Sequence, residues 1–197
     1  MATPVKFKRG EILDAALRAI AAHSLPRLTV AAVAGEMGGP TGSIYHRFES
    51  RDALLGELWL RTVARFQDGF VEVLDMAEDR EAGLSATLFT PEWVRQHPAE
   101  ARLLLLHRRE DMLGRDWPHD MEERARGLGA DLDRSLRTYA RRALGGADRR
   151  ALQRLTFALV DVPLGAVRRY VAAGKRPPAA VDDLVGLAYA AVMADDQ

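Results

Sequence analysis

Hydrophobic residues recur at helical spacing along almost the whole chain. In residues 9–23, for example, Ile12, Ala16, Ala19 and Ile20 fall on one helical face. No segment alternates hydrophobic and polar residues between turns, which is the pattern typical of half-buried strands. Glycine and proline separate the helical segments instead. The pattern therefore predicts an all-α fold.

Three helices are predicted in the N-terminal part of the chain. The first, at residues 9–23, is followed by a break at residues 24–26. Thr29 is a suitable N-cap for the second helix, which stops at Gly38 and Gly39. We expect Pro40 in the first turn of the third helix, where the amide hydrogen that proline lacks would have no partner. This third helix is predicted to run to about Phe48.

A long amphipathic helix is predicted next, with Ser50 as its N-cap. It connects the small front part of the chain with the remainder. Further helices are expected at residues 81–96, 99–112, 118–143, 147–173 and 179–194, separated by glycine and proline. We therefore predict two domains, at residues 1–50 and 51–197.

Three helices in about 40 residues, the second and third joined by two glycines, have the spacing of a helix-turn-helix. On the third helix, Ile44 and Phe48 share one side and can anchor it to a core. The remaining positions are polar, small or aromatic. Thr41 and Ser43 can meet base edges, and Gly42 permits a close approach of the backbone. We expect this side to lie in the major groove of DNA.

Longer side chains flank these small ones. Tyr45 and His46 can donate hydrogen bonds to phosphates, and Arg47 and Arg51 supply positive charge nearby. The first 56 residues hold seven basic and five acidic side chains, although the formal net charge of the whole chain is +0. The basic residues Lys6, Lys8 and Arg9 are interpreted either as a DNA-contacting arm or as a solvated tail.

Residues 9–57 resemble the N-terminal module of the TetR family of transcriptional regulators. Residues 42–45 read Gly-Ser-Ile-Tyr, and Phe48 and Leu54 also fall on positions that match the family pattern. The chain departs from this pattern at Pro40, where the family has a capping serine, and at Arg51, where it has lysine. Arginine keeps the charge but has a different donor geometry.

The resemblance implies a DNA-binding repressor that a small-molecule effector releases from its operator. Thr29, Tyr45, His46 and Arg51 would bind phosphates, while Thr41, Gly42 and Ser43 would face the groove. The family forms homodimers through its last two long helices. Two recognition helices about 34 Å apart can read a palindromic double-stranded operator. The predicted partners are therefore DNA, a second copy and an effector.

Apolar residues on the last two predicted helices support the dimer independently. The candidate interface consists of Leu152, Leu155, Leu159, Val162, Val181, Leu184, Val185, Ala188 and Val192.

Aromatic and polar residues of the larger part are candidates for an effector pocket, although helical spacing also fits a plain core. These candidates are Trp59, Phe66, Phe89, Trp93, His107, Tyr139, Phe157 and Asp161. Asp161 is equally well interpreted as a buried polar contact or as the partner of a helix bend at Pro163.

Composition narrows the function further. The chain has no cysteine, so disulfides and thiolate catalysis are excluded. No stretch approaches the roughly 20 apolar residues of a membrane span, and the N-terminus lacks the pattern of a signal peptide. We expect a cytoplasmic protein that does not interact with membranes.

Two other functions were considered. A helical-bundle enzyme would need a nucleophile, a base and an orienting group, or a complete metal-ligand set, and neither is recognisable. His119 and Glu123 stand four residues apart on one face, but two ligands do not make a metal site. An interaction scaffold that has lost DNA binding would have a damaged recognition helix. We therefore predict no enzymatic activity, no cofactor and no metal.

Overall fold

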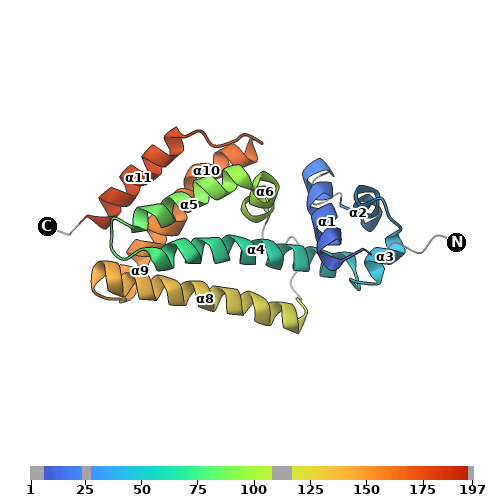
Figure 1. Cartoon of the computed structure of the whole chain (residues 1–197), viewed down its shortest axis with the longest axis horizontal. Coiled ribbons are helices and arrows are strands. Elements are labelled where there is room, and N and C mark those ends of the chain that lie inside the picture. Colours follow the sequence, from blue (N-terminus) through green and yellow to red (C-terminus); the bar gives the residue numbers. More distant parts are fainter. Residues whose placement is uncertain (1–6, 24–27, 108–116, 195–197) are drawn as a thin grey trace.

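A computed structural model describes residues 7–23, 28–107 and 117–194, and these residues form helices and connections without a strand. The elongated molecule has its small N-terminal module at one end (Figure 1). The helices are α1 (Arg9–His23), α2 (Val30–Met37), α3 (Thr41–Tyr45), α4 (Arg51–Met76), α5 (Gly83–Gln96), α6 (Pro98–Leu106), α8 (His119–Leu144), α9 (Arg149–Thr156), the π-helix η2 (Phe157–Asp161), α10 (Val162–Ala172) and α11 (Ala180–Met193). The predicted all-α fold is confirmed.

Local capping chemistry explains why the predicted N-terminal boundaries agree with the structure. The Thr29 hydroxyl accepts a hydrogen bond from the amide of Ala32 at 3.0 Å and begins α2. The Ser50 hydroxyl does the same for α4, accepting from Ala53 at 3.0 Å. At the end of α2, Gly38 has a φ of 67°, a left-handed conformation that glycine adopts without steric cost.

Gly39 is needed for a different reason. A Cβ atom there would lie 2.4 Å from Cε2 of Phe7, which packs against the N-terminal core. The side chain of Phe7, which precedes α1, therefore covers the turn between α2 and α3. The two adjacent glycines thus serve the same turn in different ways. Gly38 provides the left-handed backbone conformation, and Gly39 leaves room for the ring of Phe7.

The predicted position of Pro40 was wrong by one residue. Pro40 is the N-cap residue of α3, with extended backbone (φ −75°, ψ 148°), and it gives the helix no side-chain cap. The regular helix also ends at Tyr45 rather than at Phe48. Residues 46 and 47 continue as a turn, in which the amides of Arg47 and Phe48 donate to the carbonyl of Ile44.

Helix α4 extends from the N-terminal module into the larger part of the molecule and contributes residues to the core of each. Its first turns place Leu54, Leu55 and Leu58 among the buried residues of α1 and α2. Farther along, Phe70 and Leu74 lie in a second core with residues of α8, η2 and α11. Figure 1 shows α8 running beside α4, while α5, α10 and α11 lie on the opposite side. A displacement of α4 would therefore move the N-terminal module.

The predicted helix at residues 147–173 contains a π-helical segment at residues 157–161. Pro163 explains it, because proline lacks an amide hydrogen and its ring clashes with the carbonyl four residues earlier. The amide of Val162 donates to the carbonyl of Phe157 at the end of this segment. Of the two interpretations of Asp161, the structure supports the helix bend, since Asp161 is exposed within the π-helical segment.

Tyr139 belongs to a buried lock between helices, not to a ligand pocket, and this candidate was wrong. Its hydroxyl donates to the carbonyl of Asp79 at 2.8 Å and lies 3.0 Å from the hydroxyl of Tyr189. Tyr189 in turn donates to the carbonyl of Arg80 at 2.6 Å. The two tyrosines thus fasten α8 and α11 to the connection before α5.

Among the described residues, no helix combines the length and the apolar character needed to cross a membrane.

Candidate DNA-binding surface and effector pocket

Helix α3 has one buried side and one exposed side. Ile44 and Phe48 are buried in the N-terminal core, as predicted. The side chain of Tyr45 is 55% exposed, and Thr41, Gly42, His46 and Arg47 are also exposed. Ser43 is half-buried. The surface proposed for DNA binding is therefore accessible, and DNA contact by these residues stays a prediction.

Two candidate phosphate ligands also hold the module together. The Thr29 hydroxyl caps α2, as described above. The Nε of Arg51 donates to the carbonyl of Leu28 at 2.8 Å, and its Nη1 contacts Asp52 at 3.1 Å. Arg51 thereby fixes the start of α4 against the start of α2. These contacts position the surface on which α3 lies.

Arg9 is attached to the molecule and is not part of a solvated tail. Its guanidinium lies over the ring of Phe48, 4.6 Å from the centroid. Its Nη2 is 2.9 Å from Oε1 of Glu57. Lys8 belongs to the start of α1, where its backbone amide donates to Glu11. Lys6 lies outside the described residues.

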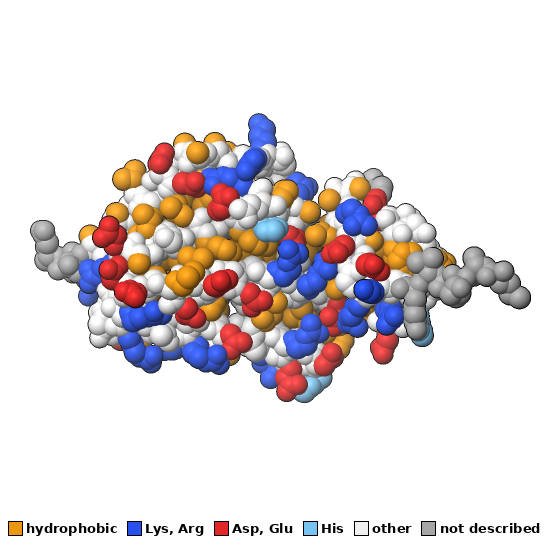
Figure 2. Space-filling view, viewed as in Figure 1, with side chains coloured by type: hydrophobic (Ala, Val, Ile, Leu, Met, Phe, Trp, Pro, Cys, Tyr) orange, Lys and Arg blue, Asp and Glu red, His pale blue; other side chains and the backbone are white. Residues whose placement is uncertain are grey.

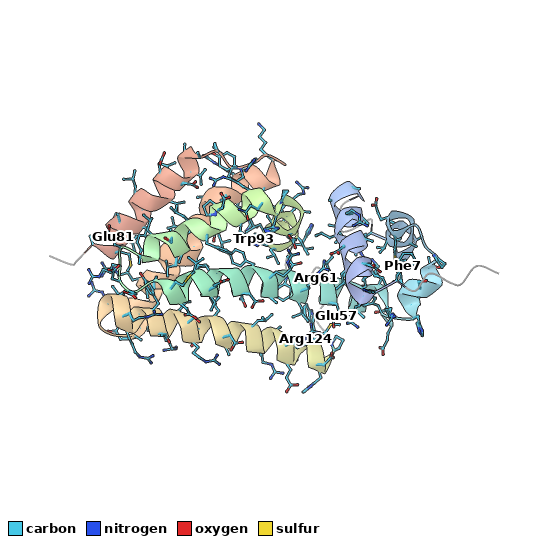
Figure 3. The ribbon with its side chains drawn as sticks, in the orientation of Figure 1. Phe7, Glu57, Arg61, Glu81, Trp93 and Arg124 are labelled. Atoms are coloured by element: carbon cyan, nitrogen blue, oxygen red, sulfur yellow. The ribbon has the colours of Figure 1, made fainter. Side chains whose placement is uncertain are left out.

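Glu57 is a buried carboxylate shared by two parts of the molecule. Besides Arg9 of α1, it binds Nη1 of Arg124 of α8 at 2.6 Å. Figure 3 shows Glu57 and Arg124 facing each other between α4 and α8. The carboxylate holds the pKa of Arg124 above its usual value, mainly through their hydrogen bond. Burial of a carboxylate is costly unless it is paired, and two guanidinium groups supply that pairing.

Arg61 makes a second ionic connection between α4 and α1. Its Nη1 lies 2.8 Å from Oδ1 of Asp14 and donates to the carbonyl of Gly10 at 3.4 Å. Figure 3 shows Arg61 on the part of α4 that faces α1. Glu57 and Arg61 together tie the N-terminal module to α4 by charge as well as by packing.

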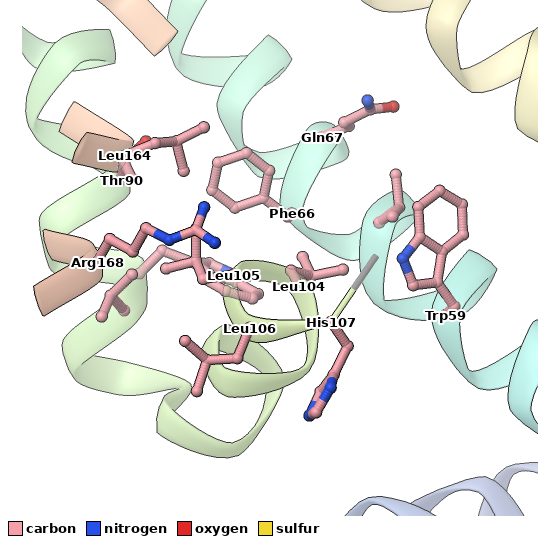
Figure 4. A pocket seen from close by; sticks show the side chains of 13 residues that line it. Trp59, Phe66, Gln67, Thr90, Leu104, Leu105, Leu106, His107, Leu164 and Arg168 are labelled. Carbon is pink, nitrogen blue, oxygen red and sulfur yellow. The ribbon is translucent and has the colours of Figure 1, made fainter. Parts of the chain in front are cut away.

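An apolar cavity of about 540 Å³ lies between α4, α5, α6 and α10. Pockets that bind small ligands are typically roughly 300–1,000 Å³ in volume. We call this cavity the effector pocket; its lining residues are Trp59, Val63, Phe66, Gln67, Thr90, Trp93, Val94, Leu104, Leu105, Leu106, His107, Leu164 and Arg168. Figure 4 shows Arg168 extending from α10 toward Phe66. The pocket can therefore take an apolar ligand and offers it a few polar contacts.

Half of the predicted pocket residues line this cavity: Trp59, Phe66, Trp93 and His107. Phe89 packs against Phe66, with ring centroids 5.6 Å apart, and stands behind the lining. Phe157 and Asp161 were wrong as pocket residues, because both are exposed beside a surface groove near α9. An aromatic residue at helical spacing does not by itself reveal which face it lies on.

Arg168 and the leucines of α6 line the pocket but were not predicted to do so. A signal for Arg168 was present, since Leu164, Arg168 and Val171 have the spacing of one helical face and only Arg168 is charged. A cation on an apolar face indicates a polar partner or a ligand. For Leu104, Leu105 and Leu106 a run of leucines predicts burial without indicating a cavity.

Helix α6 lies between the effector pocket and the N-terminal module. Its Leu103 is fully buried in the N-terminal core, whereas the next three leucines line the pocket. Its buried Glu100 pairs with Arg65 of α4 and, at 3.1 Å, with Nδ1 of His97. A ligand that moves α6 would therefore act directly on the core beneath α3.

The N-terminal module matches a known family. A model of the family described as bacterial regulatory proteins, tetR family, matches residues 12–58. This range covers most of α1, all of α2 and α3, and the beginning of α4. Residues 12–58 therefore have the N-terminal module of the TetR family. The matched segment is that of regulatory proteins, and it contains α3, the predicted recognition helix.

Solved TetR-type structures extend the similarity to the fold of the whole chain. A TetR transcription regulator from Haloarcula marismortui is 20% identical, with a TM-score of 0.71 over 94% of this chain and 95% of that one. The fatty acid degradation regulator FadR from Bacillus halodurans is 19% identical, with a TM-score of 0.69 over 96% and 100%. FadR from Bacillus subtilis in complex with stearoyl-CoA is 15% identical, with a TM-score of 0.70 over 96% and 100%. No curated protein matches the chain significantly.

The candidate dimer interface needs correction. Leu155, Leu159, Val181 and Val185 are buried inside a single copy and have no surface to offer a partner. Leu152, Val162, Ala188 and Val192 are half-buried. Leu184 is exposed, as an interface residue should be, and so is the unpredicted Leu187 (59% and 68%). The apolar residues of these helices are thus divided between the core of one copy and its surface, which helical spacing alone does not distinguish.

The described part of the chain contains no group of three or more potential metal ligands. His119 Nδ1 and Glu123 Oε2 lie 4.0 Å apart on the exposed start of α8.

Proposed function

We propose that this protein is a homodimeric repressor of the TetR type, which binds a palindromic operator through α3 and leaves it when an apolar effector fills the pocket. The observation that carries the proposal is that α6 contacts both the N-terminal core and the effector pocket. One of its residues, Leu103, lies in the core that supports α3, and its neighbours line the effector pocket. DNA binding and ligand binding are thus joined by one short helix.

At the DNA surface, we assign the groove-facing positions to Thr41, Gly42 and Ser43. Tyr45, His46, Arg47, Thr29 and Arg51 would bind the flanking phosphates. Gly42 supports this assignment, because a Cβ there would meet no protein atom within 4 Å. Nothing inside the described chain requires glycine at this helical position, whereas a closely approaching duplex would.

For the dimer, we propose the exposed side of α11, centred on Leu184 and Leu187, with the exposed side of η2 and α10. Phe157 and the mid-helix residue Gly165 belong to this second face, and a Cβ at Gly165 would meet open space. An exposed glycine weakens a helix by about 0.5–1 kcal/mol, which close contact with a partner helix would offset. A second copy related by two-fold symmetry would cover both faces.

We also propose that the domains divide at residue 50, with α4 connecting them. An effector in the pocket would displace α6 and α4 and so change the spacing of the two α3 helices. Shifting a repressor from mostly bound to mostly free takes about 5.5 kcal/mol of differential affinity, which burial of an apolar ligand can supply. FadR from Bacillus subtilis, of the same fold, was crystallised with stearoyl-CoA, which favours a long apolar effector here.

The test begins with double-stranded oligonucleotides selected from a random pool by the purified protein. We expect Tyr45→Ala to weaken binding to the selected duplex at least about tenfold, because each half of the dimer loses a phosphate contact. Fluorescence anisotropy at several salt concentrations measures this. Thermal unfolding should not change, since Tyr45 is exposed.

Two control variants sharpen the test. Tyr45→Phe separates the hydroxyl from the ring, and Arg126→Ala removes an exposed charge from α8, away from α3. Arg126→Ala should bind like the parent protein. Equal binding by Tyr45→Ala and the parent would reject α3 as the DNA-contacting element.

A further inference from the structure

A second cavity, of about 250 Å³, adjoins the effector pocket. It lies between α5, α6, the end of α10 and residues 174–176. Four cationic side chains line it, Arg95, Arg102, Lys175 and Arg176, and no acidic side chain is among its described lining residues. We call it the basic cavity. Its charge contrasts with the mostly apolar lining of the effector pocket.

The two cavities are neighbours along α6 and α10. On α6, Arg102 lines the basic cavity, whereas Leu105 and Leu106, three and four residues later on the same helix face, line the effector pocket. On α10, Arg168 lines the effector pocket and Val171 lines the basic cavity. Val94 of α5 lines both. The lining between α6 and α10 therefore changes from apolar to cationic from one cavity to the other.

Not all four cations contribute equally to the charge of the basic cavity. The side chain of Arg95 is 8% exposed and lies 2.6 Å from Asp182 and 3.1 Å from Glu92, so these carboxylates neutralise it. Glu92 also faces Arg176 at longer range. Arg102, Lys175 and Arg176 are exposed, and Nη1 of Arg102 donates to the carbonyl of Val171 at 3.2 Å. That bond holds the Arg102 guanidinium at the cavity wall.

Lys and Arg side chains are visible on this part of the surface. Figure 2 shows them gathered at the upper edge of the molecule, over the connection between α10 and α11, with a band of hydrophobic side chains below. Acidic side chains lie near them in the same view.

We infer that the two cavities bind one amphiphile, with its apolar chain in the effector pocket and an anionic head group, carboxylate or phosphate, in the basic cavity. This inference rests on the proposed effector function and adds the chemistry and the orientation of the ligand. Burial of the chain supplies most of the affinity. Guanidinium and ammonium groups bind carboxylates and phosphates through charge-assisted hydrogen bonds, which fix the orientation and disfavour neutral ligands.

The test uses four probes with the same alkyl chain: 1-dodecanol, dodecanoate, dodecyl phosphate and dodecanoyl-CoA, each below its micelle concentration. Trp59 and Trp93 line the effector pocket, so tryptophan fluorescence reports its occupation. Release of the selected duplex gives a second readout. The first variant combines Lys175→Gln with Arg176→Gln, both exposed; the second adds Arg102→Gln. The matched control combines Arg126→Gln with Arg141→Gln on exposed positions of α8.

We expect the first variant to weaken binding of the anionic probes at least about tenfold and the second to weaken it further. Binding of 1-dodecanol should not change, and the control should match the parent with every probe. Added salt should reduce the advantage of the anionic probes over 1-dodecanol. An effect on dodecanoate as large as on the phosphate probes shows that the basic cavity accepts a carboxylate as well as a phosphate; an effect on the phosphate probes alone identifies a phosphorylated head group.

Failure of the inference differs from failure of the proposed function. If 1-dodecanol binds and releases DNA while the charge variants leave the anionic probes unaffected, the basic cavity has no role and the effector pocket stands. If no probe changes the fluorescence or releases DNA, the effector pocket is wrong and the inference is overturned with it. A thermal unfolding curve for each variant confirms that it is folded.

Discussion

At the scale of single residues, Gly83 shows how closely Tyr139 and Tyr189 are packed. We call this pair of buried tyrosines the tyrosine lock. A Cβ atom at Gly83 would lie 1.8 Å from the hydroxyl of Tyr139 and 2.3 Å from that of Tyr189. Both hydroxyls are fixed by backbone carbonyls, so neither ring can move without losing its hydrogen bond. We predict that Gly83→Ala lowers the free energy of unfolding by about 1–3 kcal/mol, the usual cost of overpacking.

Denaturant titration of the full chain measures this change. Gly127→Ala is the matched control, because Gly127 lies within α8 and a Cβ there would meet nothing within 4 Å. That control should be neutral or slightly stabilising, since alanine favours a helix over glycine. A Gly83→Ala protein as stable as the control would show that the lock adapts at little cost.

The burial of Tyr189 should make the free energy of unfolding depend on pH in the alkaline range. Burial, reinforced by the neighbouring hydroxyl of Tyr139, raises the pKa of Tyr189 far above its ordinary value. In the unfolded chain the same group ionises at about pH 10, so above that pH the folded state binds more protons than the unfolded state. The stabilisation is therefore present below about pH 10 and is lost as the pH rises further.

We expect Tyr189→Phe to have a smaller decline in the free energy of unfolding between about pH 9 and pH 11 than the parent protein. Urea titrations at several pH values measure the slope. Tyr45→Phe is the control, since Tyr45 is exposed and outside the lock. Parallel slopes for Tyr189→Phe and the parent would contradict the assignment of alkaline sensitivity to this lock.

The residue scale also separates what the sequence could predict from what it could not. Thr29 and Ser50 were recognised as caps because a cap depends on the backbone three residues away. Tyr139 was misassigned because its partners, Asp79 and Tyr189, are 60 and 50 residues distant. Local hydrogen bonds are readable from one sequence, whereas long-range ones depend on the packing of whole helices.

At the scale of elements, α4 joins the N-terminal module to α8 through the Glu57 carboxylate. The carboxylate is buried and paired on one side with Arg9 and on the other with Arg124, whose guanidinium groups are about half exposed. We predict that Glu57→Gln lowers the free energy of unfolding by about 1–2 kcal/mol, reduced from the cost at a fully buried pair by solvent screening. It should also weaken DNA binding, because α1 is less firmly attached to α4.

A double-mutant cycle with Glu57→Gln and Arg9→Gln separates this interaction from other effects of each change. The exposed pair of Arg134 and Asp131 on α8 provides the comparison cycle, where we expect a coupling of less than about 0.5 kcal/mol. Equal coupling energies in the two cycles would mean that burial of Glu57 adds nothing to the connection.

The elements themselves were largely predictable, since nearly every helix boundary is marked by glycine, proline or a capping residue. The π-helix at residues 157–161 was not predicted, although Pro163 was visible. Its position depends on how α9, η2 and α10 keep their apolar sides on the same core despite the missing hydrogen bond. Periodicity alone treats such a segment as a continuous helix.

At the scale of the whole molecule, the family match of the N-terminal module and the exposed side of α3 could be predicted, because they depend on a short continuous segment of the chain. The effector pocket could be predicted only in part, since its walls come from α4, α5, α6 and α10. The exposed apolar residues were least predictable. An apolar residue on α11 can face its own core, as Val185 does, or a partner, as we propose for Leu184, and composition does not distinguish them.

Leu184 and Leu187 therefore provide the test of the assembly. Both are more than half exposed in one copy, although leucine is normally buried, and both lie on the same part of α11. We predict that Leu184→Glu combined with Leu187→Glu converts the protein to monomers, because four like charges would meet in an apolar interface. Light scattering and sedimentation measure the mass, and Ala130→Glu on exposed α8 is the control for added charge.

Loss of the dimer should be more damaging to operator binding than loss of any single DNA contact. A dimer binds the second half-site at a high effective concentration, so a monomer loses about a hundredfold or more in affinity while each α3 remains intact. The variant should keep its helical circular dichroism and its binding of 1-dodecanol in the effector pocket. A double variant that remains dimeric would place the interface elsewhere. A monomer that binds the palindrome as tightly as the parent would show that the two halves act independently.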